Sequence, residues 1–148
     1  MPEPSAPTIL LVEDNIDDVI LTRRALRKVG VSVGLVTVGD GEEAKAYLLG
    51  TGAFADRSAH PMPALLLLDW KLPRCSGAEV LQWVRARSEM DTLPVVVLTS
   101  SRQQEDIEQA YAAGANSYLQ KPVAFSELVE LLGRLHLYWF ETNVTAAR

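Results

Sequence analysis

The chain has 148 residues, of which 48% are hydrophobic and 22% charged, proportions typical of one globular domain. Its formal net charge of −5 argues against nucleic acid as a partner, because binding to phosphates needs a basic face. The sequence has no apolar stretch long enough to cross a bilayer, no secretory signal pattern and a single cysteine. We therefore expect a cytoplasmic protein with no membrane contact and no internal disulfide.

Hydrophobic runs of strand length alternate with segments whose apolar residues have helical spacing. The predicted strands are residues 9–12, 33–38, 64–68, 95–98 and 117–119. The predicted helices are residues 16–29, 40–50, 77–88, 103–113 and a last helix that starts near residue 125. This alternation predicts an α/β fold, in which a parallel sheet with right-handed crossovers carries helices on both faces.

The segments outside these elements divide the chain into three predicted parts. Residues 1–7 are predicted to be a disordered lead-in, residues 8–137 one domain and residues 138–148 a C-terminal extension. The linker 51–63 is long and rich in proline and small residues, so we expect it to be mobile or to contact a partner. No output domain is expected after the last helix, which implies action through protein contacts or by passing on a phosphoryl group.

Acidic side chains follow two of the predicted strands directly. Glu13 and Asp14 come after the first strand, and Asp69 comes after the third. Ligands of open α/β sheets bind at the carboxyl ends of the strands, so we expect the three carboxylates to share one crevice. Because like charges this close are costly without a cation, the sequence predicts a hard divalent metal, Mg²⁺.

Two further strand ends carry polar groups that suit phosphoryl transfer. Thr99 follows the fourth strand and Lys121 follows the fifth. A hydroxyl and an ammonium can bind phosphoryl oxygens that a metal ion also neutralises. Asp69, at the end of the most buried predicted strand, is the best nucleophile for an acyl phosphate. We predict that Asp69, Thr99 and Lys121 carry the chemistry.

Several short motifs at these strand ends occur together in one order. They are Leu11-Val-Glu-Asp-Asn15, Leu68-Asp69 with Leu72-Pro73 and Gly77, Leu98-Thr-Ser100, and Tyr118 before Lys121-Pro122. Together they resemble the receiver domain of two-component response regulators over about residues 8–136. The resemblance implies a flavodoxin-like doubly wound sheet of five parallel strands in the order 2-1-3-4-5.

The resemblance also implies roles for single residues. Asp69 would accept a phosphoryl group from a phosphohistidine of a sensor histidine kinase. The backbone carbonyl of Lys71 would join Glu13, Asp14 and Asp69 as a ligand of Mg²⁺. Thr99 and Lys121 would bind the phosphoryl group.

The same resemblance implies a switch. Thr99 and Tyr118 would move together and report phosphorylation to the face formed by the fourth helix, the fifth strand and the fifth helix. In the family the Lys121–Pro122 peptide bond is usually cis, and proline makes that isomer feasible, but the sequence alone does not determine the isomer. Lys71 departs from the family pattern, in which this position is often neutral or amide-bearing. We expect Lys71, with Ser101, to flank the path of the attacking water and to alter the lifetime of the phosphoryl group.

A narrower resemblance concerns the sensor. The long loop before the third strand, residues 98–107 and the aromatic-rich tail are similar to stand-alone response regulators that pair with bacterial and cyanobacterial phytochromes. This similarity implies a phytochrome-type kinase as the partner.

The last predicted helix is apolar on more than one side. One stripe, formed by Leu128, Leu132, Leu135 and Trp139, is expected to face the core. The remaining apolar residues favour a homodimer, and the alternative is an extension that folds back on its own domain. The candidate dimer contacts are Leu131, Leu137, Tyr138, Trp139 and Phe140.

Two other functions compete with a phospho-acceptor signalling protein that catalyses its own phosphorylation and dephosphorylation. A Mg²⁺-dependent phosphatase of the haloacid-dehalogenase type needs a second Asp two residues beyond the nucleophile, where this chain has Lys71. A pseudo-receiver scaffold, which is never phosphorylated, would not need the acidic residues, Thr99 and Lys121. We therefore expect a signalling protein and not an enzyme.

Overall fold

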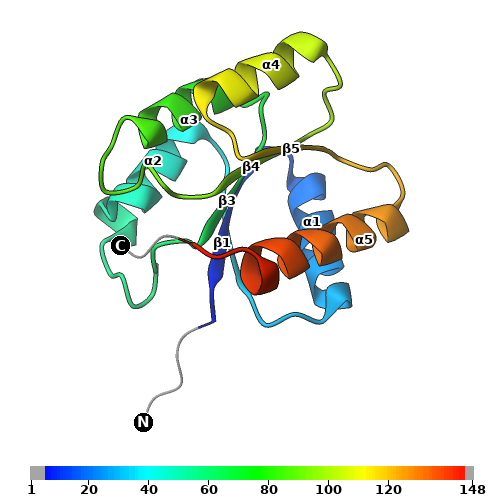
Figure 1. The fold of residues 1–148 in the computed structure, drawn as a ribbon. Helices are drawn as coiled ribbons and strands as arrows, with labels where there is room; N and C mark the ends of the chain where they lie inside the picture. Colours follow the sequence, from blue (N-terminus) through cyan, green and yellow to red (C-terminus); the bar gives the residue numbers. More distant parts are fainter. Residues whose placement is uncertain (1–5, 146–148) are drawn as a thin grey trace.

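The computed structural model describes residues 6–145, which form a parallel sheet with helices on both faces (Figure 1). The strands are β1 (Thr8–Val12), β2 (Gly34–Val38), β3 (Leu65–Leu68), β4 (Val95–Thr99) and β5 (Ser117–Gln120). All neighbouring strands are parallel, and their order is β2-β1-β3-β4-β5. The predicted flavodoxin-like, doubly wound fold is confirmed.

Two groups of helices sandwich the sheet. They are α1 (Ile16–Val29), α2 (Gly41–Leu49), α3 (Gly77–Arg85), α4 (Gln104–Ala113) and α5 (Phe125–His136). Helices α1 and α5 cover one face of the sheet, whereas α2, α3 and α4 lie on the other (Figure 1). No helix within residues 6–145 is long and apolar enough to span a membrane.

The central strands are buried on both faces. Every residue of β1, β3 and β4 is buried, and alternate side chains pack into two separate clusters. Leu66 belongs to the cluster on the α2 and α3 side, and Leu67 belongs to the cluster on the α1 and α5 side. The register pairs Val12 with Leu68, so the carboxylates that follow each strand emerge at the same edge of the sheet.

The linker before β3 is anchored against α2, although its composition led us to expect mobility. The Arg57 guanidinium donates hydrogen bonds to the carbonyl oxygens of Tyr47 at 2.8 Å and Leu48 at 2.6 Å. These carbonyls lie in the last turn of α2, where intrahelical donors are lacking. The Tyr47 hydroxyl in turn donates to the Pro61 carbonyl at 2.8 Å. Side-chain contacts across the linker therefore hold it in place.

Two boundaries differ from the predicted ones by more than one residue. Helix α3 ends at Arg85 and not at residue 88, because the chain turns there toward the buried side chain of Met90. The Arg85 guanidinium reaches across this turn to the carbonyl oxygen of Leu93 at 2.7 Å. Helix α5 continues into a π-helical turn, Leu137–Thr142, at the start of the predicted extension. Residues 1–5 of the predicted lead-in and residues 146–148 of the extension lie outside the described residues.

Candidate functional site

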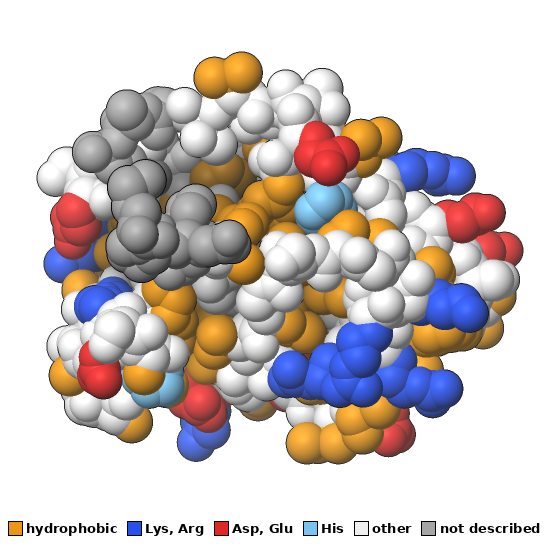
Figure 2. Space-filling view, turned by 90° about the horizontal axis from the view of Figure 1, so that it is seen from below, with side chains coloured by type: hydrophobic (Ala, Val, Ile, Leu, Met, Phe, Trp, Pro, Cys, Tyr) orange, Lys and Arg blue, Asp and Glu red, His pale blue; other side chains and the backbone are white. Residues whose placement is uncertain are grey.

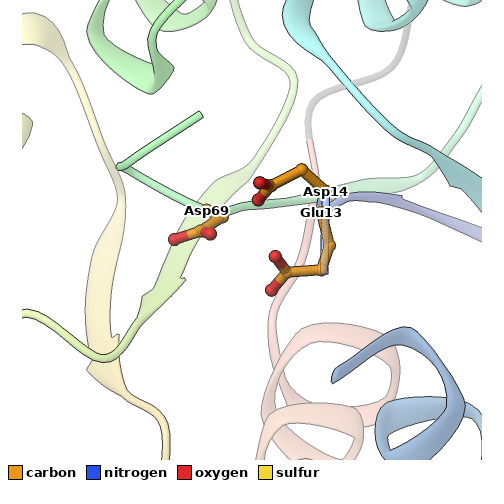
Figure 3. A group of neighbouring side chains, drawn as sticks. All are labelled: Glu13, Asp14 and Asp69. Atoms are coloured by element: carbon orange, nitrogen blue, oxygen red, sulfur yellow. The ribbon is translucent and has the colours of Figure 1, made fainter. Parts of the chain in front are cut away.

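Three carboxylates meet at the carboxyl ends of β1 and β3 (Figure 3). One oxygen each from Glu13, Asp14 and Asp69 lies within 4.8 Å of the others. The strands hold this arrangement, since the Asp69 N–H donates to the Val12 carbonyl at 3.0 Å. The three carboxylates that the sequence predicted to lie together therefore do so. Its all-oxygen donor set fits a hard divalent cation, which would relieve the repulsion between the carboxylates.

Burial disfavours the ionised forms of these carboxylates. Glu13 is 3% exposed and Asp69 is 7% exposed, whereas Asp14 is open to solvent. Burial raises the pKa of Glu13 to about 7, and the nearby Asp69 charge acts in the same direction against the Lys121 ammonium, which lowers it. A cation bound at this site would favour the ionised form of Glu13.

Lys121 supplies positive charge to the crevice from the end of β5. Its Nζ pairs with Glu13, lies 3.1 Å from Asp18 Oδ2 and lies 3.8 Å from Asp69 Oδ2. Burial alone would lower the pKa of this ammonium, but the hydrogen bond to Glu13 and the Asp69 charge raise it above its usual value. Asp18 was not predicted as a site residue, although it lies in the first turn of α1, directly after the strand end that carries Glu13 and Asp14.

The fourth strand places Thr99 beside Lys121. The Lys121 N–H donates to the Thr99 carbonyl at 2.8 Å, and the Thr99 side chain is buried at the end of β4. The structure therefore brings together the five strand-end residues that the sequence singled out: Glu13, Asp14, Asp69, Thr99 and Lys121. The Lys121–Pro122 bond is trans, whereas the resemblance to receiver domains implies cis. An X–Pro bond favours trans by only about 0.5–1 kcal/mol, so neither isomer is costly in such a loop.

Lys71 and Tyr118 are joined through a second small network. The Lys71 Nζ lies 3.2 Å from Asp106 Oδ2 on α4, and the Ser101 hydroxyl donates to the same oxygen at 2.5 Å. The Tyr118 hydroxyl donates to the Ser101 carbonyl at 3.0 Å. Asp106 was not singled out from the sequence, because a polar residue in the first turn of a helix is also expected from the helix dipole alone.

Gly77 leaves no room for a side chain beside the acceptor. A Cβ atom at Gly77 would lie 2.7 Å from the backbone oxygen of Asp69 and 2.9 Å from the Trp70 Cα atom. We predict that Gly77→Ala lowers the unfolding free energy by about 1–3 kcal/mol, because backbone must shift to accept the methyl group. Urea unfolding measures this loss.

Gly133→Ala is the matched control. A Cβ atom at Gly133 would make ordinary contacts of 3.9 Å with the Val29 side chain, and the residue lies inside α5. Alanine is the better helix former, so this change should stabilise the protein by about 0.5–1 kcal/mol. Equal effects of the two substitutions would contradict the close approach at Gly77.

The candidate dimer residues divide into two groups. Leu131, Trp139 and Phe140 are partly buried and pack against the core cluster under α1 and α5. Leu137 is 55% exposed and Tyr138 is 50% exposed. Of the predicted core stripe, Leu128, Leu132 and Leu135 are buried, whereas Trp139 is only partly buried.

Comparisons with a family model, with curated proteins and with solved structures all point to the same family. The family model for the response regulator receiver domain matches residues 9–133. Response regulator Rcp1 from Synechocystis sp. is 34% identical, with 90% of this chain and 89% of Rcp1 covered. A crystal structure of Rcp1 in its Mn²⁺-bound form matches with a TM-score of 0.83, covering 95% of this chain and 99% of that one.

Two further solved structures agree in sequence and in fold. The phosphorylated cyanobacterial phytochrome response regulator RcpA is 35% identical with a TM-score of 0.87. RPA3017, described in red light signalling of R. palustris, is 33% identical with a TM-score of 0.91. Each match covers 96% of this chain and 99% of the other. The chain therefore belongs to the response regulator receiver domain family.

Proposed function

We propose that this chain is a phospho-acceptor of a two-component system, which receives a phosphoryl group from a sensor histidine kinase on Asp69. The observation that carries the proposal is the position of Asp69. Its carboxylate lies at the end of a fully buried strand, beside two further carboxylates and 3.8 Å from the Lys121 ammonium. These groups suit the transfer of a phosphoryl group onto the Asp69 carboxylate.

The transfer follows from these positions. An Asp69 oxygen attacks phosphorus, the new O–P bond forms, and the N–P bond of the phosphohistidine breaks with its electron pair left on the imidazole. The Lys121 ammonium and the Thr99 hydroxyl would bind phosphoryl oxygens. Mg²⁺, held by Glu13, Asp14, Asp69 and the Lys71 carbonyl, would neutralise charge on those oxygens when bound. Because the chain supplies these groups itself, it would catalyse both its own phosphorylation and the later hydrolysis.

Phosphorylation of Asp69 would change the conformation of the face formed by α4, β5 and α5. Thr99 lies at the crevice, and Tyr118 on β5 bonds to the carbonyl of Ser101, two residues beyond Thr99. A displacement of the Thr99 segment toward the phosphoryl group would therefore pull on Tyr118. We assign Thr99 and Tyr118 as the switch residues on this basis.

A phytochrome-type kinase in the cytoplasm is the partner that we propose. The support is the similarity over almost the whole chain to response regulators described with cyanobacterial phytochromes and red light signalling. Phosphotransfer from a purified phytochrome-type kinase should be much faster than from an unrelated histidine kinase. Equal rates with both kinases would contradict this pairing.

A homodimer through the end of α5 is also proposed. Leu137 and Tyr138 are exposed. Tyr138 also lines a cavity of about 300 Å³, together with the apolar Leu119, Leu131, Leu135 and Trp139 and the polar Ser117 and Arg134. Hydrophobic side chains gather on the face of the molecule seen from below (Figure 2). Sedimentation should give a dimer mass for the native chain and a monomer mass for Leu137→Glu. A monomer mass for the native chain would refute the dimer.

Intact mass measurement after incubation with acetyl phosphate and Mg²⁺ tests the proposed function. The native chain should gain one phosphoryl group, and Asp69→Asn should gain none. Asp17→Asn is the control, because it removes an exposed carboxylate from the first turn of α1. No gain by the native chain from acetyl phosphate or from a phosphorylated kinase would favour the pseudo-receiver, and release of free phosphate from small phosphate esters would favour the phosphatase.

A further inference from the structure

The two residues that follow Asp69 both contact helix α4. The Trp70 indole Nε1 donates to Gln109 Oε1 at 3.2 Å, and the Lys71 Nζ lies 3.2 Å from Asp106 Oδ2. Positions 106 and 109 are three residues apart, so they lie on the same side of the helix. The loop that follows the acceptor is therefore bound directly to α4.

Asp106 also binds the loop that carries Thr99. The Ser101 hydroxyl donates to Asp106 Oδ2, the same oxygen that faces Lys71. The Ser101 hydrogen bond lowers the pKa of Asp106 against the effect of burial, and Lys71 adds to the lowering. The carboxylate is therefore ionised at neutral pH, and it joins the acceptor loop, the Thr99 loop and the first turn of α4.

The two partners of this ion pair differ in their freedom to move. The Asp106 side chain is 9% exposed, whereas the Lys71 side chain is 62% exposed. Lys71 has a long flexible stem and a strongly hydrated ammonium, so it can change partners at low cost. The other ammonium beside the carboxylates, that of Lys121, is already paired with Glu13, Asp18 and Asp69. Phosphorylation adds about one further negative charge at Asp69, and Lys71 is two residues away from it.

We propose that Asp106 is a latch residue, which holds Lys71 on α4 until the phosphoryl group on Asp69 draws the ammonium away. This inference rests on the proposed phosphorylation of Asp69. Loss of the Lys71 contact leaves Asp106 with the Ser101 hydrogen bond alone and loosens the first turn of α4. The acceptor would thus act on α4 by a charge-driven route that starts at Lys71 and not at Thr99.

A double-mutant cycle tests the latch with beryllofluoride and Mg²⁺, which mimic the phosphoryl group on Asp69. Asp106→Asn keeps an oxygen that accepts the Ser101 hydrogen bond but removes the charge that competes for Lys71. It should bind beryllofluoride roughly two- to fivefold more tightly, the size expected for a partly exposed ion pair. In a Lys71→Met background, the same Asp106→Asn change should have no effect on the affinity.

Hydrogen exchange gives a second readout, in which the response to beryllofluoride separates the latch from a purely structural role of Asp106. Beryllofluoride should speed exchange of the backbone amides in residues 104–108 of the native chain. In Asp106→Asn these amides should exchange at the faster rate already, with no further change on adding beryllofluoride. Glu105→Gln is the matched control, because it removes an exposed charge from the neighbouring position of α4.

The outcomes separate the latch from the function on which it rests. Unchanged beryllofluoride affinity in Asp106→Asn, an equal gain in Glu105→Gln, or a gain that persists with Lys71→Met would overturn the latch alone. If the native chain binds no beryllofluoride and takes no phosphoryl group, both the latch and the proposed function are overturned.

Discussion

Divalent cations are expected to stabilise this protein by about 2.7 kcal/mol when the free cation reaches one hundred times its dissociation constant. Without a cation, the site buries Glu13 and Asp69 side by side, and burial raises the pKa of Glu13 to about 7. The ionised carboxylates repel one another, so the native state gains more from a cation than the unfolded chain does. Urea unfolding with Mg²⁺ and with a chelator measures the difference.

Substitution of Asp14 provides the decisive variant for this prediction. Asp14→Asn should lose most of the stabilisation by Mg²⁺, because one of the three carboxylates is gone. With the chelator it should be at least as stable as the native chain, because the repulsion has decreased. The control Asp17→Asn should respond to Mg²⁺ like the native chain. Equal stabilisation of Asp14→Asn and the native chain would place the cation elsewhere.

Removal of Lys121 is expected to give the other large effect. In the cation-free protein, Lys121→Met should lower the unfolding free energy by about 3 kcal/mol well above pH 7, because it leaves buried carboxylates without their partner. The hydrogen bond from Lys121 lowers the pKa of Glu13, so the substitution raises that pKa further above its unfolded value. A proton bound to Glu13 in the native state then removes the unpaired negative charge and restores part of the unfolding free energy.

The pH dependence of this loss has a definite sign. The native state of Lys121→Met binds more protons than the unfolded chain between the unfolded and folded pKa values of Glu13, so its stability falls as the pH rises through that window. Above about pH 7 the native state of Lys121→Met keeps a proton on Glu13 that the native chain has lost, so the deficit should shrink as the pH is lowered towards about 7. Lys45→Met, which removes an ammonium 3.6 Å from the exposed Glu42, should cost at most about 1 kcal/mol. A loss for Lys121→Met that is independent of pH would contradict this reading of the crevice.

The sequence predicted the main features of the site because they depend on strand ends. Apolar runs that stop at Glu13, Asp69 and Thr99 determine which residues reach the carboxyl edge, and parallel pairing brings those ends together. The family motifs then supplied the strand order. Both steps rest on local patterns that are visible in one sequence.

Contacts between side chains far apart in the sequence were not predictable in this way. The Lys71–Asp106 pair and the Trp70–Gln109 hydrogen bond join the β3–α3 loop to α4 across more than thirty residues. The anchoring of the linker by Arg57 depends on the position of α2, which the sequence places only approximately. The composition of the linker 51–63 therefore suggested mobility, whereas its contacts with α2 hold it in place.

Chemical mapping identifies the phosphorylated residue itself. Borohydride reduces an acyl phosphate to an alcohol, so a phosphorylated aspartate becomes homoserine, which peptide mass spectrometry can locate. After incubation with acetyl phosphate, we predict homoserine at position 69 only when Mg²⁺ is present. Homoserine at position 14, stable phosphate on Thr99, or labelling that does not require a divalent cation would contradict the role of Asp69 as the acceptor.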